Sequence, residues 1–526
     1  MAERAMAATP ASNANLFSIL RAGFPDDLDT TAIETVAEVP LRYTWRDIER
    51  ATAMFANLLD SLDLPAGARI AVQAEKSVES LLFYLAVLRA GHVYLPLNTA
   101  YKSDELSYFL GNAEPSVLVC APKDFARLSK LAFAAGTGWV FSLGGDRSGS
   151  LLERATHFPD THAVAERGSD DLAAILYTSG TTGRSKGAML SHGNLASNAL
   201  TLKGYWGWRT PAEGGDVLIH ALPIFHVHGL FVASHGALLA GAKMLWLDRF
   251  DARVVVGLLP RATVFMGVPT LYVRMLAEPG LDQVACRNMR LFISGSAPML
   301  VETFAAWRVR TGHTILERYG MSETAMLTSN PYLARDGERR GGTVGFPLPG
   351  VELRIRDDQG RPLGADEIGG IEVRGPNVFS GYWRMPEKTR DEFAEDGWFR
   401  TGDVGKVDER GYVTIVGRSK DLIISGGFNV YPAEVEAALN DLPGVAESAV
   451  VGVPHADFGE AVVAVVVAQP GVALDGESLV ATLKAKMANF KVPKALFVAA
   501  ELPRNAMGKV QKNLLREQHA GQFRQA

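Results

Sequence analysis

The sequence has 526 residues, more than one ordinary hydrophobic core can organise, so its length predicts several lobes. It is 47% hydrophobic, and 53 basic residues against 58 acidic ones leave a net charge of −5, which is typical of a globular protein and argues against an electrostatic nucleic-acid binder. The two cysteines, Cys120 and Cys286, lie in or beside apolar runs, which argues against a disulfide framework or a cysteine metal site.

The N-terminal segment 1–15 is rich in alanine and lacks the apolar stretch of a signal peptide. The most apolar segment, 231–247, is interrupted by His235 and Lys243 and is too short for a membrane span. We therefore expect a cytoplasmic protein without a membrane span; a mitochondrial matrix location stays open if the source is eukaryotic.

Short apolar strands and amphipathic helices alternate from residue 69 onward. The pattern predicts strands at 69–73, 93–97 and 116–120, with helices at 78–90 and 103–111 between them. A second series of the same kind begins at 172–177 and continues through 216–222, 230–239, 244–247, 263–268 and 289–294. Such alternation with short links is typical of βαβ units, so we expect two α/β layers with mainly parallel sheets.

The pattern of apolar, polar and glycine residues changes twice more along the chain. After about residue 343, glycine-punctuated strands at 351–356, 370–373 and 411–416 predict a small β-rich lobe. From residue 420 we expect strands at 421–424, 428–430, 448–453 and 462–468, with helices from 432 and near 477–487. The sequence thus predicts a large multi-lobed α/β domain over 1–419 and a small α+β domain over 420–526.

The most specific motif is Tyr-Thr-Ser-Gly-Thr-Thr-Gly-Arg-Ser-Lys-Gly at 177–187, between an apolar strand and a helix expected at 192–202. Glycines let backbone amides point at phosphate oxygens, hydroxyls add donors, and a lysine adds a cation. The spacing does not fit the G-x-x-x-x-G-K-[ST] loop, which disfavours a kinase or motor ATPase. The motif predicts a phosphate-binding loop with Thr178, Ser179, Gly180, Thr181, Thr182, Gly183 and Lys186 as candidate ligands.

These eleven residues resemble the signature loop of the adenylate-forming acyl-CoA synthetases, and the resemblance extends over roughly 15–518. Segment 319–324 resembles the family's nucleotide and Mg²⁺ segment, 402–403 its ribose-binding aspartate, 417–421 its arginine and hinge, and 503–509 its catalytic lysine segment. The resemblance implies ATP contacts from Tyr319, Gly320, Thr324, Asp403, Arg418 and Lys509, metal contacts from Glu323 and Thr178, and catalytic roles for Lys509, Lys186 and Glu323.

The same resemblance implies a two-step reaction that uses ATP, Mg²⁺ and coenzyme A. The mobile C-terminal domain closes with Lys509 over ATP and the acid, and then rotates about Lys420 to admit the CoA thiol. The glycine turn with Ser425, Gly426 and Gly427 is expected to face that thiol. Acetylation of Lys509 by a regulatory acetyltransferase, reversed by a deacetylase, would remove its charge.

Three features of the sequence concern the carboxylic acid that the protein is expected to activate. They are His226 and His228, the turn Ser294-Gly295-Ser296-Ala297-Pro298, and Arg318 just before the motif tyrosine. By resemblance Ser296, Ala297 and Pro298 line the ATP site, and His226, His228, Ser294, Arg318 and Met321 line the substrate carboxylate site. A guanidinium at 318 offers a planar fork to a second carboxylate. The alternatives are a core role for His228, adenine contacts for the serines, and an ion pair of Arg318 with Glu317 or a nearby acid.

Within the family the chain resembles the malonyl-CoA synthetases, so we expect malonate as the acid, with methylmalonate accepted as well. The alternatives are a ligase for another small, fatty or aromatic acid, a stand-alone adenylation module that loads a carrier protein, and a catalytically silent binding protein. Intact Lys186, Glu323, Asp403 and Lys509 argue against the last. The expected partners are small molecules, without nucleic acid or membrane.

Overall fold

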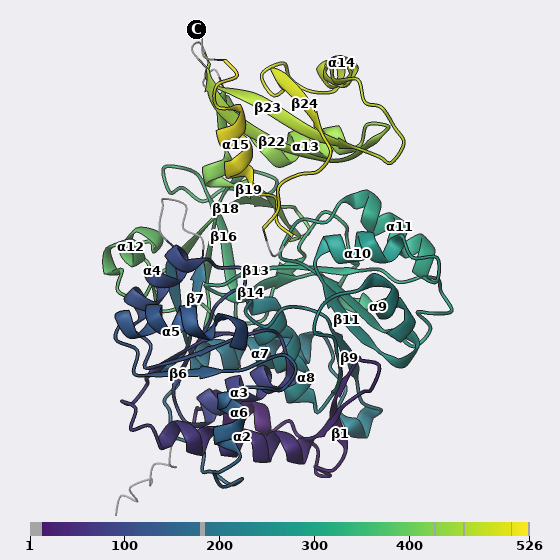
Figure 1. Ribbon diagram of the computed structural model, residues 1–526. Coiled ribbons are helices and arrows are strands. Elements are labelled where there is room, and N and C mark those ends of the chain that lie inside the picture. Colours follow the sequence, from purple (N-terminus) through teal and green to yellow (C-terminus); the bar gives the residue numbers. More distant parts are fainter. Residues whose placement is uncertain (1–12, 179–184, 426–427, 456–457, 506–507, 524–526) are drawn as a thin grey trace, which may run out of the picture.

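Two sheets form the large N-terminal body of the protein (Figure 1). The computed structural model describes residues 13–178, 185–425, 428–455, 458–505 and 508–523. The six-stranded sheet has the order β6 (Trp139–Ser142), β5 (Val117–Cys120), β3 (Arg69–Gln73), β4 (Val93–Pro96), β7 (Leu172–Thr178) and β8 (Lys186–Ser191). All its neighbours are parallel except β7 and β8, whose antiparallel register pairs Thr178 with Lys186.

The nine-stranded sheet is parallel in its middle and antiparallel at both edges. Its order is β15 (Phe346–Pro347), β14 (Ala325–Ser329), β13 (Leu316–Met321), β12 (Leu291–Ser294), β11 (Val264–Gly267), β9 (Val217–His220), β10 (Lys243–Trp246), β1 (Thr31–Thr35) and β2 (Arg42–Thr44). The two predicted α/β layers are therefore confirmed.

Helices cover and separate these sheets. They are α1 (Leu16–Arg21), α2 (Trp45–Asp60), α3 (Val78–Arg89), α4 (Ser103–Ala113), α5 (Phe125–Ala134), α6 (Ser150–Ala155), α7 (His192–Tyr205), α8 (His235–Ala240), α9 (Ala252–Leu258), α10 (Pro269–Leu276) and α11 (Val301–Thr311). Short 3₁₀ turns lie at η1 (Pro122–Asp124), η2 (Pro211–Glu213), η4 (Leu259–Arg261) and η5 (Ala334–Asp336).

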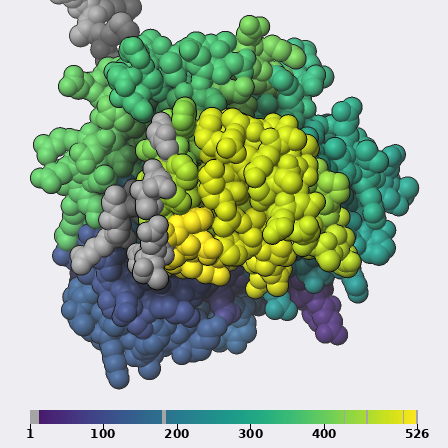
Figure 2. Space-filling model, turned by 90° about the horizontal axis from the view of Figure 1, so that it is seen from above, coloured from purple at the N-terminus to yellow at the C-terminus, as the bar shows by residue number. Residues whose placement is uncertain are grey.

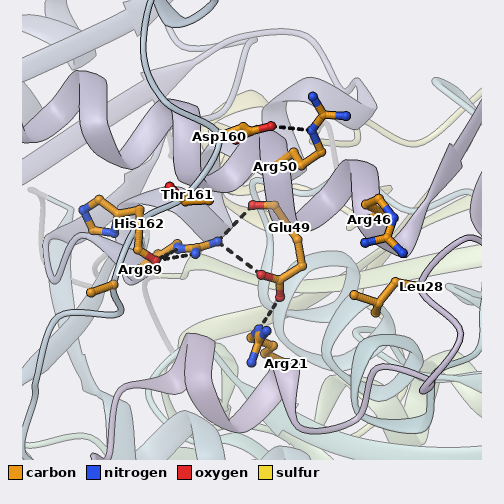
Figure 3. Close-up of a pocket in the computed structure, with 10 residues that line it drawn as sticks. Arg21, Leu28, Arg46, Glu49, Arg50, Arg89, Asp160, Thr161 and His162 are labelled. Atoms are coloured by element: carbon orange, nitrogen blue, oxygen red, sulfur yellow. Dashed lines mark hydrogen bonds and ion pairs between the residues drawn. The ribbon is translucent and has the colours of Figure 1, made fainter.

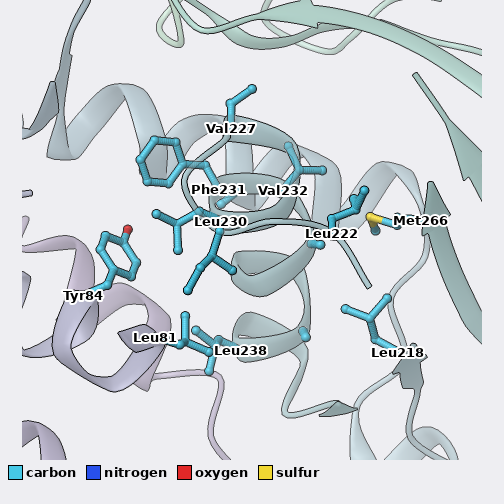
Figure 4. Packing of buried hydrophobic residues seen from close by; sticks show 14 of the residues in the cluster. Leu81, Tyr84, Leu218, Leu222, Val227, Leu230, Phe231, Val232, Leu238 and Met266 are labelled. Carbon is cyan, nitrogen blue, oxygen red and sulfur yellow. The ribbon is translucent and has the colours of Figure 1, made fainter. Parts of the chain in front are cut away.

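Helix α3 lies at the centre of the body, because every residue in it is buried. Apart from Glu79, Ser80 and Arg89 the helix is apolar all round, which is typical of a helix in a core. Leu81 and Tyr84 of α3 pack beside Leu230 and Phe231 of the π-helix η3 (His228–Ser234), as Figure 4 shows. Segment 230–239 of the predicted series is thus helical, running through η3 into α8.

The β-rich lobe and the C-terminal lobe complete the fold. The former is an antiparallel sheet of β16 (Glu352–Arg356), β17 (Gly369–Arg374), β18 (Phe399–Val407) and β19 (Val413–Arg418), with α12 (Pro386–Glu392) beside it. The latter follows η6 (Ser419–Asp421) and has the strand order β21 (Phe428–Val430), β20 (Ile423–Ser425), β23 (Gly459–Ala468) and β22 (Val445–His455), with β24 (Ala495–Ala499) parallel to β23.

Strand β23 has a core on each face, because its side chains alternate. One face packs against α13 (Pro432–Asn440) and α14 (Gly476–Lys486), and the other against α15 (Lys512–His519). These clusters begin at Ile423, close to the predicted boundary between residues 419 and 420, which stays a prediction. Among the described residues no helix is both long and apolar enough to cross a membrane.

Candidate active site

The predicted site residues lie where the carboxyl ends of strands meet the C-terminal lobe. Thr178 ends β7, Ser294 ends β12, and Met321 ends β13. The crevice beyond the carboxyl ends of parallel strands is where α/β sheets bind ligands. Figure 2 shows the C-terminal residues, in yellow, lying across this end of the body.

Asp403 is the centre of the predicted ribose site. It is buried in β18, and the β18–β19 register sets it opposite Arg418, whose Nε lies 2.9 Å from its Oδ1. The hydroxyl of Tyr319 donates to the other carboxylate oxygen. The structure therefore brings Asp403, Arg418 and Tyr319 together, as the sequence predicts, and fixes the carboxylate from two sides.

Glu323 is a buried carboxylate with few partners. It accepts hydrogen bonds from the hydroxyls of Tyr382 at 3.0 Å and Thr178 at 3.4 Å, and burial raises its pKa. Hard oxygen donors of this kind suit Mg²⁺, which completes its shell with water and phosphate oxygens. The described residues contain no group of three or more histidine, cysteine, aspartate or glutamate side chains that could hold a metal ion.

Lys186 is buried at the start of β8. Its ammonium lies 2.9 Å from Glu392 at the end of α12 and 4.4 Å from the ring centroid of Tyr382. The other candidate phosphate ligands, from Ser179 to Gly183, lie outside the described residues. Tyr382 and Glu392 were not among the predicted site residues, since their contacts with Lys186 join segments that are distant in the sequence.

Arg318 is buried in β13, with 2% of its surface exposed. Its Nε and Nη2 have no hydrogen-bond partner among the described residues, and the same holds for Ser294 Oγ and His228 Nε2. Buried donors without partners are rare and costly, so such a cluster points to a missing anionic or polar ligand. Burial lowers the pKa of Arg318 to about 9, which leaves it charged at neutral pH.

The ion pair of Arg318 with Glu317 is absent, since no carboxylate of the described residues lies within 4.0 Å of the guanidinium. Neighbouring residues of a strand point to opposite faces. Glu317 instead accepts the N–H of Gly342 at 3.3 Å, and burial raises its pKa to about 8. A Cβ placed on Gly295 would lie 2.6 Å from Arg318 Cζ, so the glycine makes room for the guanidinium.

The two histidines face the same region. Burial, with contributions from Lys509 and Arg318, lowers the pKa of His226 to about 3, and burial followed by Arg318 also lowers that of His228. Both rings are therefore neutral at physiological pH. His228 Nδ1 lies 3.4 Å from the Ser296 hydroxyl, and Ser296 adopts a left-handed φ of 70°. The bond ties the turn of residues 294–298 to the candidate carboxylate site.

The remaining predicted residues are placed around this pocket or in the C-terminal lobe. Thr324 is buried and its hydroxyl donates to the Ala325 carbonyl, whereas Met321 is half-buried at the end of β13. Ser425 is buried in β20, and its partners Gly426 and Gly427 lie outside the described residues. Lys420 is exposed in η6, between β19 and β20.

Lys509 reaches the site from the C-terminal lobe. Although the residue keeps solvent-accessible surface, the surrounding protein and then Arg418 lower the pKa of its ammonium to about 8, while Asp403 acts in the opposite direction. A Cβ on the neighbouring Gly508 would lie 3.3 Å from Thr270 Oγ1, so this loop approaches the N-terminal body. The structure thus places Lys509 where the charges of Arg418 and Asp403 act on it, beside the predicted ribose site.

Helix α2 lies at the far end of the body from the C-terminal lobe (Figure 1). There it lines a separate cavity of about 550 Å³ (Figure 3). The cavity contains none of the predicted site residues. Its arginines are already paired, Arg21 with Glu49, Arg46 with Asp29 and Arg50 with Asp160. The cavity is thus lined by paired arginines, and the predicted site residues lie at the other end of the body.

The chain matches the family described as AMP-binding enzyme over residues 26–383, and the AMP-binding enzyme C-terminal domain over residues 434–509. It is similar to ATP-bound MatB from Rhodopseudomonas palustris, with 54% identity and a TM-score of 0.93 over 97% of this chain and all of that one. The apo form of that protein gives a TM-score of 0.82 with the same identity and coverage.

Two curated relatives with lower sequence identity to this chain are named for different acids. A malonate–CoA ligase of Arabidopsis thaliana is 36% identical over 86% of this chain and 78% of its own length. A feruloyl-CoA synthase of Amycolatopsis sp is 35% identical over 90% of this chain and 93% of its own. Identity of this order therefore indicates a CoA ligase, and the acid has to be argued from the pocket.

Proposed function

The chain belongs to the AMP-binding enzyme family and is an AMP-forming acyl-CoA ligase, and on that premise we propose that it converts malonate, ATP and CoA to malonyl-CoA, AMP and diphosphate through a malonyl-adenylate. One observation carries the choice of acid: Arg318 is buried, and two of its guanidinium nitrogens, Nε and Nη2, have no partner among the described residues, beside Ser294 and His228. A second carboxylate matches that fork, and methylmalonate has one too.

Each group has a defined task in this proposal. Asp403 accepts hydrogen bonds from the ribose hydroxyls of ATP, and Lys186 leaves Glu392 to meet the phosphates. Arg318 binds the distal carboxylate of malonate, so that the other carboxylate is presented to the α-phosphate. Lys509 neutralises the charge that develops there as diphosphate leaves, which is how a fixed cation lowers a barrier. Mg²⁺ bound by ATP supplies further charge neutralisation beside Glu323.

A panel of acids tests the proposal directly. AMP release should be measured with CoA present for malonate, methylmalonate, butyrate, octanoate and ferulate. Malonate should be used with the highest kcat/KM. Preference for a monocarboxylic acid would instead support the alternative of a fatty or aromatic acid ligase, and AMP release that needs a carrier protein in place of CoA would support an adenylation module.

The arrangement of the lobes resembles the ATP-bound state, since the TM-score with ATP-bound MatB exceeds that with its apo form. We therefore infer that this is the adenylating arrangement and that Lys420 in η6 is the hinge.

Lys420→Pro should restrict φ at the hinge and hold the two lobes in one arrangement, so that one half-reaction persists while overall turnover falls by about tenfold or more. Separate assays of the two half-reactions check this. Lys420→Ala is the control and should be mild; unchanged turnover in Lys420→Pro would place the hinge elsewhere.

The lowered pKa of Lys509 predicts a pH dependence. Its ammonium loses its proton as pH rises through about 8, well below the usual value, so the useful charge is present below that pH and lost above it. The kcat/KM of adenylation should therefore show a descending limb near pH 8. Lys509→Arg should remove the limb, because arginine stays protonated. A limb at the same pH in that variant would assign it to another group.

We also propose that Lys509 is acetylated and that the protein is cytoplasmic. Acetylation of Lys509 would abolish its charge, and its accessible surface is compatible with an acetyltransferase. The cytoplasmic location also stays a prediction.

A further inference from the structure

Tyr382 contacts two groups of the active site at once. Its hydroxyl donates to Glu323 Oε1 at 3.0 Å, and the Lys186 ammonium lies 4.4 Å from its ring centroid. The residue is only 4% exposed. Tyr382 therefore contacts both Glu323, the candidate metal ligand, and Lys186, the candidate phosphate ligand.

Backbone hydrogen bonds hold this tyrosine in place from both sides. The N–H of Phe379 donates to the Glu323 carbonyl at 2.8 Å, and the N–H of Trp383 donates to the Gly187 carbonyl at 2.8 Å. Segment 379–383 is thus tied to Glu323 at one end and to the strand of Lys186 at the other. The N–H of Tyr382 itself donates to Thr389 Oγ1 of α12 at 2.9 Å.

Helix α12 also carries the acid that Lys186 contacts. Glu392 Oε1 lies 2.9 Å from the Lys186 ammonium, so the lysine is held away from Glu323 by a second carboxylate. Glu323 and Lys186 both contact Tyr382, so their opposite charges lie close to each other. In a site with little water such an attraction is strong.

We propose that Tyr382 is a positioning residue that keeps Lys186 and Glu323 from closing into a direct ion pair. Such a pair would neutralise the cation needed by the phosphates and occupy the carboxylate needed by the metal. The tyrosine ring binds the Lys186 ammonium through a cation–π contact, and the tyrosine hydroxyl orients Glu323. Glu392 holds the lysine from the other side until phosphate oxygens replace it. This inference rests on the proposed ATP-dependent function.

Equilibrium titration of the full chain with ATP in EDTA isolates the role of Lys186, because no metal is then bound beside Glu323. Tyr382→Leu should weaken ATP binding by about tenfold or more, because without the ring Lys186 pairs with Glu323 and its charge-assisted hydrogen bonds to the phosphates are lost. Adding Glu323→Gln removes the competing carboxylate, so the double variant should bind ATP within about threefold of Glu323→Gln alone. Tyr382→Phe keeps the ring and should bind ATP in EDTA within about threefold of the wild type.

Lys388→Ala is the matched control, since it removes another cation near Glu392, at 3.9 Å, from the same helix. It should leave ATP binding within about threefold of the wild type. If Glu323→Gln does not restore ATP binding to Tyr382→Leu, the tyrosine acts through packing alone and the inference is overturned; wild-type affinity in Tyr382→Leu overturns it too. Failure of the wild type to bind ATP with or without Mg²⁺ defeats the proposed function, and the inference with it.

A second variant decides the matter if Tyr382→Leu does not fold. Tyr382→Phe removes only the donor to Glu323, so the Mg²⁺ concentration that half-maximally tightens ATP binding should rise by about tenfold while binding in EDTA is kept. An unchanged Mg²⁺ requirement, or an equal loss with and without Mg²⁺, would overturn the proposed role.

Discussion

Lys509→Ala should separate the two half-reactions, lowering malonyl-adenylate formation by about 10²- to 10³-fold, the usual effect of losing one electrostatic donor at a transition state. The reason is positional: the charges of Arg418, Asp403 and Glu323 act on Lys509, and we propose that it lies where charge develops at the α-phosphate. Thioester formation from supplied malonyl-AMP needs no such charge and should change little. Malonate-dependent pyrophosphate exchange measures the first step, and CoA-dependent consumption of malonyl-AMP measures the second.

Lys512→Ala provides the matched control for this prediction. Lys512 is a nearby lysine of the same lobe, but its ammonium pairs with Glu436 at 2.6 Å, within the C-terminal lobe. Its loss should leave both half-reactions nearly unchanged. Equal losses in the two half-reactions of Lys509→Ala would mean that the lysine supports the fold or the closure of the lobe, and its catalytic assignment would fail.

Much of the fold could be predicted because the strands of a buried parallel sheet are short apolar runs between helices. Predicted strands at 69–73, 93–97 and 116–120 correspond to β3, β4 and β5, and the helix at 78–90 to α3. The segment 230–239 shows the limit of this reading. Every residue of η3 and α8 is buried, so no polar face marks the helical period, and an apolar run alone does not separate strand from helix.

Antiparallel strands within and beside the site were harder to predict. Strand β8 begins at Lys186, inside the phosphate-loop motif, and β13 runs through the nucleotide motif at Tyr319. Both sequences are dominated by functional residues, which hides the apolar pattern of a strand. Tyr382 was missed for a related reason: its role depends on Lys186 and Glu323, which are distant in sequence and adjacent only in the fold.

Arg318→Ala should lower kcat/KM for malonate and methylmalonate by about 10- to 150-fold. Hydrogen bonds to charged groups contribute about 1.5 to 3 kcal/mol, and truncation leaves the distal carboxylate unpaired in a buried pocket. Butyrate and propionate lack that carboxylate and should be used as well as before or better. Measuring AMP release with all four acids separates a loss of selectivity from a general loss of activity.

Three variants make this prediction specific to the guanidinium fork. Arg318→Lys should recover little, because an ammonium does not reproduce two planar N–H donors. Ser294→Ala and His228→Ala should act in the same direction, since both side chains have buried polar atoms that lack partners among the described residues.

Gly295→Ala is the most demanding test, because it leaves Arg318 in the sequence. The added Cβ would lie 2.6 Å from Arg318 Cζ, so the guanidinium has to move. Selectivity should then shift as in Arg318→Ala, against the two diacids and not against butyrate. If Arg318→Ala instead lowered kcat/KM for malonate and butyrate alike, the arginine would support the structure of the pocket without binding the second carboxylate. The choice of malonate would then rest on similarity to relatives alone.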